Sequence, residues 1–244
     1  MIAPEVFTFA STARLSRAAA ETVVETLRAA IQRHGRASFV LTGGGTPRPL
    51  YQLLATDYRN ALDWQRVEVL FGDERHVPHD DADSNFLMAR DTLLDGLPLS
   101  PDRVHPIPTG STPEADARAY EQTLRGLFDG DVPAFDLVLL GMGADGHVAS
   151  LFPGSPALDE AERWVVAAEA PPSSPVHDRV TLTFPAINAA HTVLFLVAGE
   201  SKRDALTAVL RGPENAPPAE RVEARERLLW YVDDDAYGPG ADAV

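Results

Sequence analysis

Residues 135–153 of the chain read Phe-Asp-Leu-Val-Leu-Leu-Gly-Met-Gly-Ala-Asp-Gly-His-Val-Ala-Ser-Leu-Phe-Pro. The run 137–140 is short, apolar and stopped by glycine, which predicts a strand covered on both faces of a parallel sheet. In open α/β sheets ligands bind beyond the carboxyl ends of the strands, and Asp145 and His147 follow this strand. A carboxylate and an imidazole on a glycine-rich loop can act as a general acid/base and its orienting partner. The alternative is an ordinary turn with a surface histidine, because short glycine patterns recur by chance.

Other apolar runs alternate with segments of helical periodicity, which predicts one α/β domain over residues 1–244. The predicted strands are 38–41, 67–71, 137–140, 164–167, 179–183, 193–197 and 228–232. The predicted helices are 14–33, 47–57, one that begins near Ser84, 112–128, a short one at 184–187, and 201–210. The acidic, glycine-rich stretch after residue 232 is expected to fray.

The composition is that of an ordinary globular protein, with 45% hydrophobic and 23% charged residues in a chain of 244. No apolar run approaches the roughly 20 residues that span a membrane. The amino terminus lacks the basic region and apolar core of a signal peptide, so we expect a cytoplasmic protein with no membrane partner. The chain has no cysteine, which excludes disulfide bonds and thiolate chemistry.

The formal net charge of −15 argues against a nucleic-acid partner, which requires a clustered basic face. A small anionic substrate needs only a few cations gathered in one pocket. The 21 basic residues contain a single lysine, Lys202, in the first turn of the predicted helix 201–210. A cation at that end of a helix is unfavourable unless an anion binds nearby.

The stretch 42–47, Thr-Gly-Gly-Gly-Thr-Pro, connects a predicted strand to a predicted helix. Consecutive glycines expose backbone N–H groups, Thr46 is expected to cap the helix, and Pro47 suits its first position. Such a helix start is a ready anion site. The stretch lacks the Gly-Lys-Ser/Thr ending of a nucleoside-triphosphate loop and the full dinucleotide fingerprint, so neither ATP nor NAD is indicated. A flexible turn that binds nothing is the alternative.

Charged residues also follow the predicted strand 67–71, where Gly72 precedes Asp73-Glu74-Arg75. A surface salt bridge and a functional site are both compatible with this group, and its place at a strand terminus favours function. The loop that follows, 76–83, contains His76, His79 and aspartates, which are residue types of divalent-metal sites. Nothing fixes their geometry, so no metal is expected.

Together these motifs resemble the 6-phosphogluconolactonase family. The matching segments, in family order and over nearly the whole chain, are 41–47, 72–78 with 84–85, 141–147 with 150–153, 179–183, 199–203 and 230–233. The resemblance implies a Rossmann-like α/β fold with a mostly parallel sheet and helices on both faces. It also implies hydrolysis of 6-phospho-D-glucono-1,5-lactone to 6-phospho-D-gluconate without a metal or an organic cofactor. The oligomeric state stays open between monomer and weak dimer.

By analogy with the family, His147 is the general acid/base, Asp145 sets its tautomer, and Arg75 stabilises the oxyanion. Asp73 holds a substrate hydroxyl or positions Arg75, and is the second candidate base. The residues assigned to the 6-phosphate are Gly43, Gly44, Gly45, Thr46, Arg179 and Lys202.

The related glucosamine-6-phosphate deaminases are the main alternative. They place a glutamate before the proline of the 150–153 segment and a tyrosine after Asp-Glu, where this chain has Phe152 and Arg75. Phenylalanine cannot relay a proton, so both departures favour lactone hydrolysis. A non-catalytic sugar-phosphate sensor is a third possibility, but no basic helix-turn-helix segment accompanies the domain.

Overall fold

A computed structural model describes residues 2–129, 132–212 and 216–238. Its centre is a sheet of six parallel strands in the order β1-β9-β8-β5-β2-β3. The strands are β1 Glu5–Phe9, β2 Ala37–Leu41, β3 Val67–Phe71, β5 Leu137–Gly141, β8 Thr192–Val197 and β9 Arg227–Asp233. Every residue of β2, β3 and β8 is buried, as expected of strands covered on both faces. The parallel sheet predicted from these apolar runs is therefore confirmed.

The strand order changes direction between β2 and β5. From β2 the chain moves outward to β3 at one edge, whereas β5, β8 and β9 are added in turn on the other side. Strands β2 and β5 pair directly, with Phe39 opposite Leu137 and Val40 opposite Val138. Loops that leave such a pair diverge to opposite faces, which opens a crevice at the carboxyl ends of β2 and β5.

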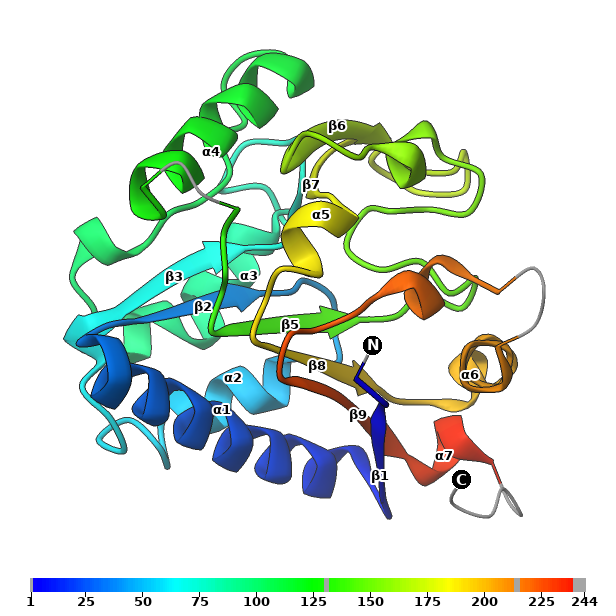
Figure 1. Cartoon of the computed structure of the whole chain (residues 1–244), viewed down its shortest axis with the longest axis horizontal. Coiled ribbons are helices and arrows are strands. Elements are labelled where there is room, and N and C mark those ends of the chain that lie inside the picture. Colours follow the sequence, from blue (N-terminus) through cyan, green and yellow to red (C-terminus); the bar gives the residue numbers. More distant parts are fainter. Residues whose placement is uncertain (1, 130–131, 213–215, 239–244) are drawn as a thin grey trace.

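Helices and a second sheet cover the two faces (Figure 1). The helices are α1 Thr12–His34, α2 Arg48–Ala55, α3 Asn85–Thr92, α4 Pro113–Leu127, α5 Phe184–Ile187, α6 Arg203–Arg211 and α7 Asp234–Tyr237. In Figure 1, α1 and α2 lie below the sheet, and α4 and α5 lie above it. Helix α1 buries Leu15, Ala19, Val23 and Leu27 at a spacing of four residues and ends at Gly35, whose φ is +78°.

The second sheet is antiparallel and was not expected from the sequence. It contains β4 Asp73–Arg75, β7 Asp178–Leu182 and β6 Val165–Glu169, in the order β4-β7-β6, and α4 packs on it. The segments 164–167 and 179–183 do form strands, β6 and β7, but β7 pairs with β6 and with β4 and neither joins the large sheet. Because β4 follows β3 after the single residue Gly72, it carries Asp73 and Arg75 to this sheet.

Two further predictions need correction. Strand β1 was missed, because its side chains are mostly exposed and lack the apolar pattern of a buried strand. The stretch after 232 was expected to fray, but it is partly ordered. The Asp233 carboxylate accepts hydrogen bonds from Thr12 Oγ1 (2.9 Å) and from the Gly199 N–H (2.9 Å). It also accepts the Ala236 N–H (3.0 Å) and thereby caps α7. Residues 239–244 lie outside the described part. No helix among the described residues is long and apolar enough to cross a membrane.

Candidate active site

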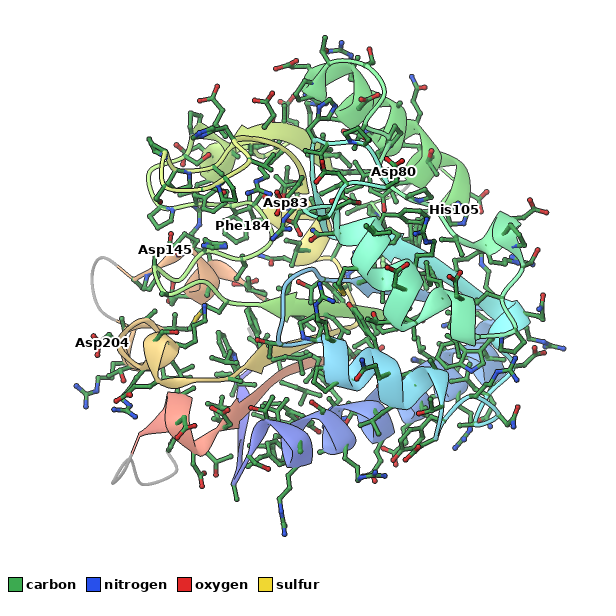
Figure 2. The ribbon with its side chains drawn as sticks, turned by 180° about the vertical axis from the view of Figure 1, so that it is seen from behind. Asp80, Asp83, His105, Asp145, Phe184 and Asp204 are labelled. Atoms are coloured by element: carbon green, nitrogen blue, oxygen red, sulfur yellow. The ribbon has the colours of Figure 1, made fainter. Side chains whose placement is uncertain are left out.

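The turn after β5 holds Asp145 and His147 together. Gly143 donates its N–H to the carbonyl of His147 (2.9 Å), and Gly146 donates to the carbonyl of Gly143 (3.0 Å). Gly146 has a φ of +77°, which glycine adopts without strain. Asp145 Oδ1 lies 2.6 Å from His147 Nδ1, so the carboxylate orients the ring and Nε2 faces away from it. Figure 2 shows Asp145 in the loop beyond the carboxyl end of β5.

This pair is partly open to solvent, with 31% of the His147 side chain and 44% of the Asp145 side chain exposed. The hydrogen bond with His147 lowers the pKa of the Asp145 carboxyl below its usual range, so Asp145 is ionised at neutral pH. An ionised carboxylate beside Nδ1 favours the tautomer with the proton on Nδ1. Nε2 is then the basic nitrogen.

Two neighbours restrict the imidazole further. A Cβ atom at Gly143 would lie 2.1 Å from His147 Nδ1 and 2.4 Å from Asp145 Oδ1, so only glycine leaves room for the pair. The ring of Phe152 packs against the imidazole with centroids 4.5 Å apart. Phe152 therefore contributes packing to the site and no proton-transfer group.

Asp73, the first residue of β4, is buried and fixed from two sides. Ser150 Oγ donates to Asp73 Oδ2 (2.7 Å), and the Ser150 N–H is held by Thr181 Oγ1 of β7 (3.1 Å). Asn85 Nδ2 donates to the Asp73 carbonyl (3.0 Å) and lies 3.4 Å from Oδ1. Asp73 is thus positioned by β7 and α3 as well as by its own strand.

Glu74, the neighbouring acid, holds the start of α3. Its carboxylate accepts the N–H groups of Arg75 (2.8 Å), Asn85 (2.6 Å) and Phe86 (2.8 Å) and the hydroxyl of Ser84 (3.1 Å). A carboxylate is favourable at a helix amino terminus. Burial raises the pKa of Glu74 above its usual range. The two acids therefore differ in role, because Asp73 lines the site and Glu74 orders the helix behind it.

Arg75 and Arg179 are cross-strand partners in the second sheet. Arg75 Nη1 donates to the carbonyl of Asp83 (2.6 Å). Arg179 is 6% exposed, and its Nη2 donates to Ser174 Oγ (2.8 Å) and to the Val176 carbonyl (2.9 Å). Its Nε and Nη1 are buried with no hydrogen-bond partner among the described residues. Burial also lowers the pKa of Arg179, and donors of a buried cation that stay unpaired cost free energy.

The glycine loop, residues 42–47, connects β2 to α2. Thr46 was expected to cap this helix, but α2 begins at Arg48 behind Pro47 and has no side-chain cap, so that prediction is wrong. Lys202 ends the short 3₁₀-helix that precedes α6. Its ammonium has no hydrogen-bond or ion-pair partner in the part of the chain that the structure describes. The loop and Lys202 line one hollow together with His147.

Two hollows meet at a shared wall of Asp73, Arg75, His147 and Ala149. The residues predicted for the site that line only the first hollow are Gly43, Gly44, Gly45, Thr46 and Lys202. Those that line only the second are Asp145 and Arg179. The structure therefore brings the predicted residues to one region, but it does not bring Arg179 and Lys202 into the same hollow.

The histidines considered as metal ligands have protein partners. His76 Nε2 lies 2.8 Å from Asp116 Oδ2, and His79 Nε2 lies 2.8 Å from the Ile107 carbonyl. Within residues 2–129, 132–212 and 216–238, no group of three or more histidine or acidic side chains is arranged to hold a metal ion.

Comparison with known proteins assigns the family. A family model described as glucosamine-6-phosphate isomerases/6-phosphogluconolactonase matches residues 10–230. The chain belongs to the glucosamine-6-phosphate isomerase/6-phosphogluconolactonase family. Within this family it is 40% identical over 242 residues to a 6-phosphogluconolactonase of Synechocystis sp., a match that covers 96% of this chain and 98% of that protein.

Solved structures of the glucosamine-6-phosphate isomerase/6-phosphogluconolactonase family share the fold. The 6-phosphogluconolactonase of Trypanosoma cruzi superposes with a TM-score of 0.88 at 33% identity, over 96% of both chains. A monomeric glucosamine-6-phosphate deaminase superposes with a TM-score of 0.78 at 25% identity, over 95% of this chain and 98% of that one. The chain is similar to both branches of the family and more similar to this lactonase.

Sequence reasoning missed Asn85 and Ser150 as residues that hold Asp73. Both occur in the segments that carry the family resemblance, and both are polar residues directly beside apolar ones, Phe86 and Leu151. A polar residue that is buried there requires a polar partner, and that requirement is the signal that was available. The partner itself lies 12 residues away for Asn85 and 77 away for Ser150, beyond what a local pattern identifies.

Proposed function

We propose that the chain hydrolyses 6-phospho-D-glucono-1,5-lactone to 6-phospho-D-gluconate. The observation that carries the proposal is the Asp145–His147 pair, 2.6 Å apart, whose histidine lies in the wall shared by two hollows. One hollow contains a glycine loop and a lysine that has no partner among the described residues, and both suit a phosphate. The chain's relatives named 6-phosphogluconolactonase support this substrate.

In the proposed reaction His147 Nε2 takes a proton from a water molecule as the water oxygen bonds to C1 of the lactone. The carbonyl electrons move to the carbonyl oxygen, and the guanidinium of Arg75 stabilises the negative charge. The intermediate collapses, the bond between C1 and the ring oxygen breaks, and the imidazolium returns its proton to that oxygen. The products are a free hydroxyl at C5 and a carboxylic acid that ionises.

Asp73 lies in the wall beside His147 with one carboxylate oxygen engaged by Ser150. We assign it to a substrate hydroxyl, with Arg75 as its neighbour on β4. The 6-phosphate is assigned to the glycine loop and Lys202, and Arg179 supplies further positive charge from the adjoining hollow. No step requires a metal or an organic cofactor.

The deaminase reaction is less favoured at this site. It requires an additional acid/base group for ring opening and isomerisation, and the position next to His147 is taken by the phenyl ring of Phe152 at 4.5 Å. A purely sensing role would leave the oriented Asp145–His147 pair without a task.

Turnover of the purified protein tests the proposal. Hydrolysis of the phosphorylated lactone should exceed its spontaneous rate and should be unchanged by a chelator, while glucosamine 6-phosphate should release no ammonia. Hydrolysis no faster than the spontaneous rate would reject the lactonase assignment, and activity that is lost to a chelator and restored by a divalent ion would reject the metal-free mechanism.

A further inference from the structure

Asn85 has an unusual environment for the first residue of a helix. Its backbone N–H is held by Glu74 Oε1 at 2.6 Å, and the helix is capped by Ser84, which accepts the N–H of Leu87. The helix start is therefore secured without the Asn85 side chain. That side chain is nevertheless turned inward and only 2% of the residue is exposed.

The side-chain amide touches two parts of the site at once. Its Nδ2 donates to the carbonyl of Asp73 (3.0 Å) and lies 3.4 Å from the Asp73 carboxylate. Its other end covers Gly43, because a Cβ atom at Gly43 would lie 1.9 Å from Asn85 Oδ1 and 2.3 Å from Cγ. One rigid, planar group thus spans the space between Asp73 and the first residue of the glycine run.

The amide oxygen is buried and has no hydrogen-bond partner among the described residues. A buried acceptor without a donor lowers stability, so stability alone does not explain an amide at this position. Gly43 has no positive φ, so a left-handed backbone conformation is not what requires glycine at this position. A side chain at Gly43 is excluded because the Asn85 amide occupies the position that its Cβ atom would take.

We propose that Asn85 is a positioning residue that fixes the glycine loop relative to Asp73. The proposal rests on the proposed function, in which the loop binds the phosphate and Asp73 binds the sugar next to the reacting carbon. Asn85 holds the separation between these two contacts, so one amide aligns the lactone carbonyl with His147. Misplacement of a substrate by about 1 Å can cost on the order of 10²-fold in rate.

Kinetics of Asn85→Ala test this role, with Asn188→Ala as the matched control. Asn188 also joins backbone groups through its side chain, since it donates to the Arg221 carbonyl (3.0 Å) and accepts the Glu223 N–H (3.0 Å), but it lines neither hollow. Asn85→Ala should raise KM and lower kcat, with kcat/KM reduced by about 10²-fold. Asn188→Ala should leave both constants unchanged. Wild-type constants in a folded Asn85→Ala protein would overturn the proposal.

A double-mutant cycle with Gly43→Ala tests the contact itself. Gly43→Ala alone should be strongly impaired, because its Cβ meets the Asn85 amide. In the Asn85→Ala background the same change should cost much less, because the space is then free. An equal cost in both backgrounds would show that the substrate, not Asn85, excludes a side chain at Gly43, and would also overturn the proposal.

Calorimetric binding of 6-phospho-D-gluconate to the same variants separates this inference from the proposed function. Asn85→Ala should bind the product more weakly than wild type and Asn188→Ala. A wild-type protein that binds the product without hydrolysing the lactone would reject the proposed function, and the Asn85 variant's binding would still decide the positioning role.

Discussion

The imidazole of His147 has one nitrogen held by Asp145 and the other free of that contact, and the residue lines both hollows. His147→Ala should therefore lower kcat by roughly 10²- to 10⁴-fold and change phosphate affinity little, because a general acid/base acts mainly in the transition state. The measurement is kcat corrected for spontaneous hydrolysis, with a thermal melt of the same preparation.

His191→Ala is the matched control for His147→Ala. His191 also pairs with a carboxylate, Glu226, at 2.8 Å, but it precedes β8 at the amino-terminal edge of the sheet. Its loss should leave kcat unchanged. A folded His147→Ala protein with wild-type turnover would leave Asp73 as the candidate base.

Lys202 is the second residue whose contribution can be isolated. Its ammonium lines the hollow of the glycine loop, and a charge-assisted hydrogen bond is worth about 1.5–3 kcal/mol, or one to two decades in affinity. Lys202→Ala should raise KM for the phosphorylated lactone by one to two decades and leave KM for the unphosphorylated lactone nearly unchanged. Equal effects on both substrates would show that Lys202 does not bind the phosphate.

At the level of elements, the site depends on how tightly the turn after β5 closes. Gly143→Ala would push a Cβ atom to within 2.1 Å of His147 Nδ1, so the Asp145–His147 pair must separate or rotate. We expect kcat to fall by about 10²-fold or more. Circular dichroism and a melting curve should show a folded protein, because the turn lies outside the sheet.

Gly126→Ala provides the control for this prediction. Gly126 lies in α4 with nothing within 4 Å of the added Cβ, and alanine is favoured over glycine in helices by roughly 1 kcal/mol. This variant should melt at a slightly higher temperature with unchanged kcat. If Gly143→Ala kept wild-type turnover, the close packing of the turn would not be required for catalysis.

For the molecule as a whole, a formal net charge of −15 surrounds a site proposed to bind an anion. Binding of 6-phospho-D-gluconate at 100 times its Kd should add about 2.7 kcal/mol to the free energy of unfolding. For a protein of this size that corresponds to a rise in Tm of about 5–10 °C. Differential scanning calorimetry measures the shift, and gluconate at the same concentration should produce little. An equal shift with gluconate would argue against phosphate recognition.

The sequence by itself determined the elements of the large sheet other than β1, and which residues follow the ends of those strands. Buried parallel strands are apolar on both faces, so apolar runs such as 137–140 and 193–197 can be recognised as strands from the sequence alone. A glycine near the end of each run indicates where the strand stops. The Asp145–His147 pair was also predictable, because both residues occur in one short turn. Interactions that depend on adjacent residues leave a local pattern.

Only the tertiary structure decided which separate segments face one another. Short strands such as β4 and β7 carry no signal for their partner, so the second sheet, and with it the separation of Arg179 from Lys202, depends on pairing between distant segments. The same holds for the contact of Asn85 with Gly43 and for the Ser150 hydrogen bond to Asp73. These contacts form between chain segments that the backbone brings together only after the sheet and helices have packed, so no local pattern records them.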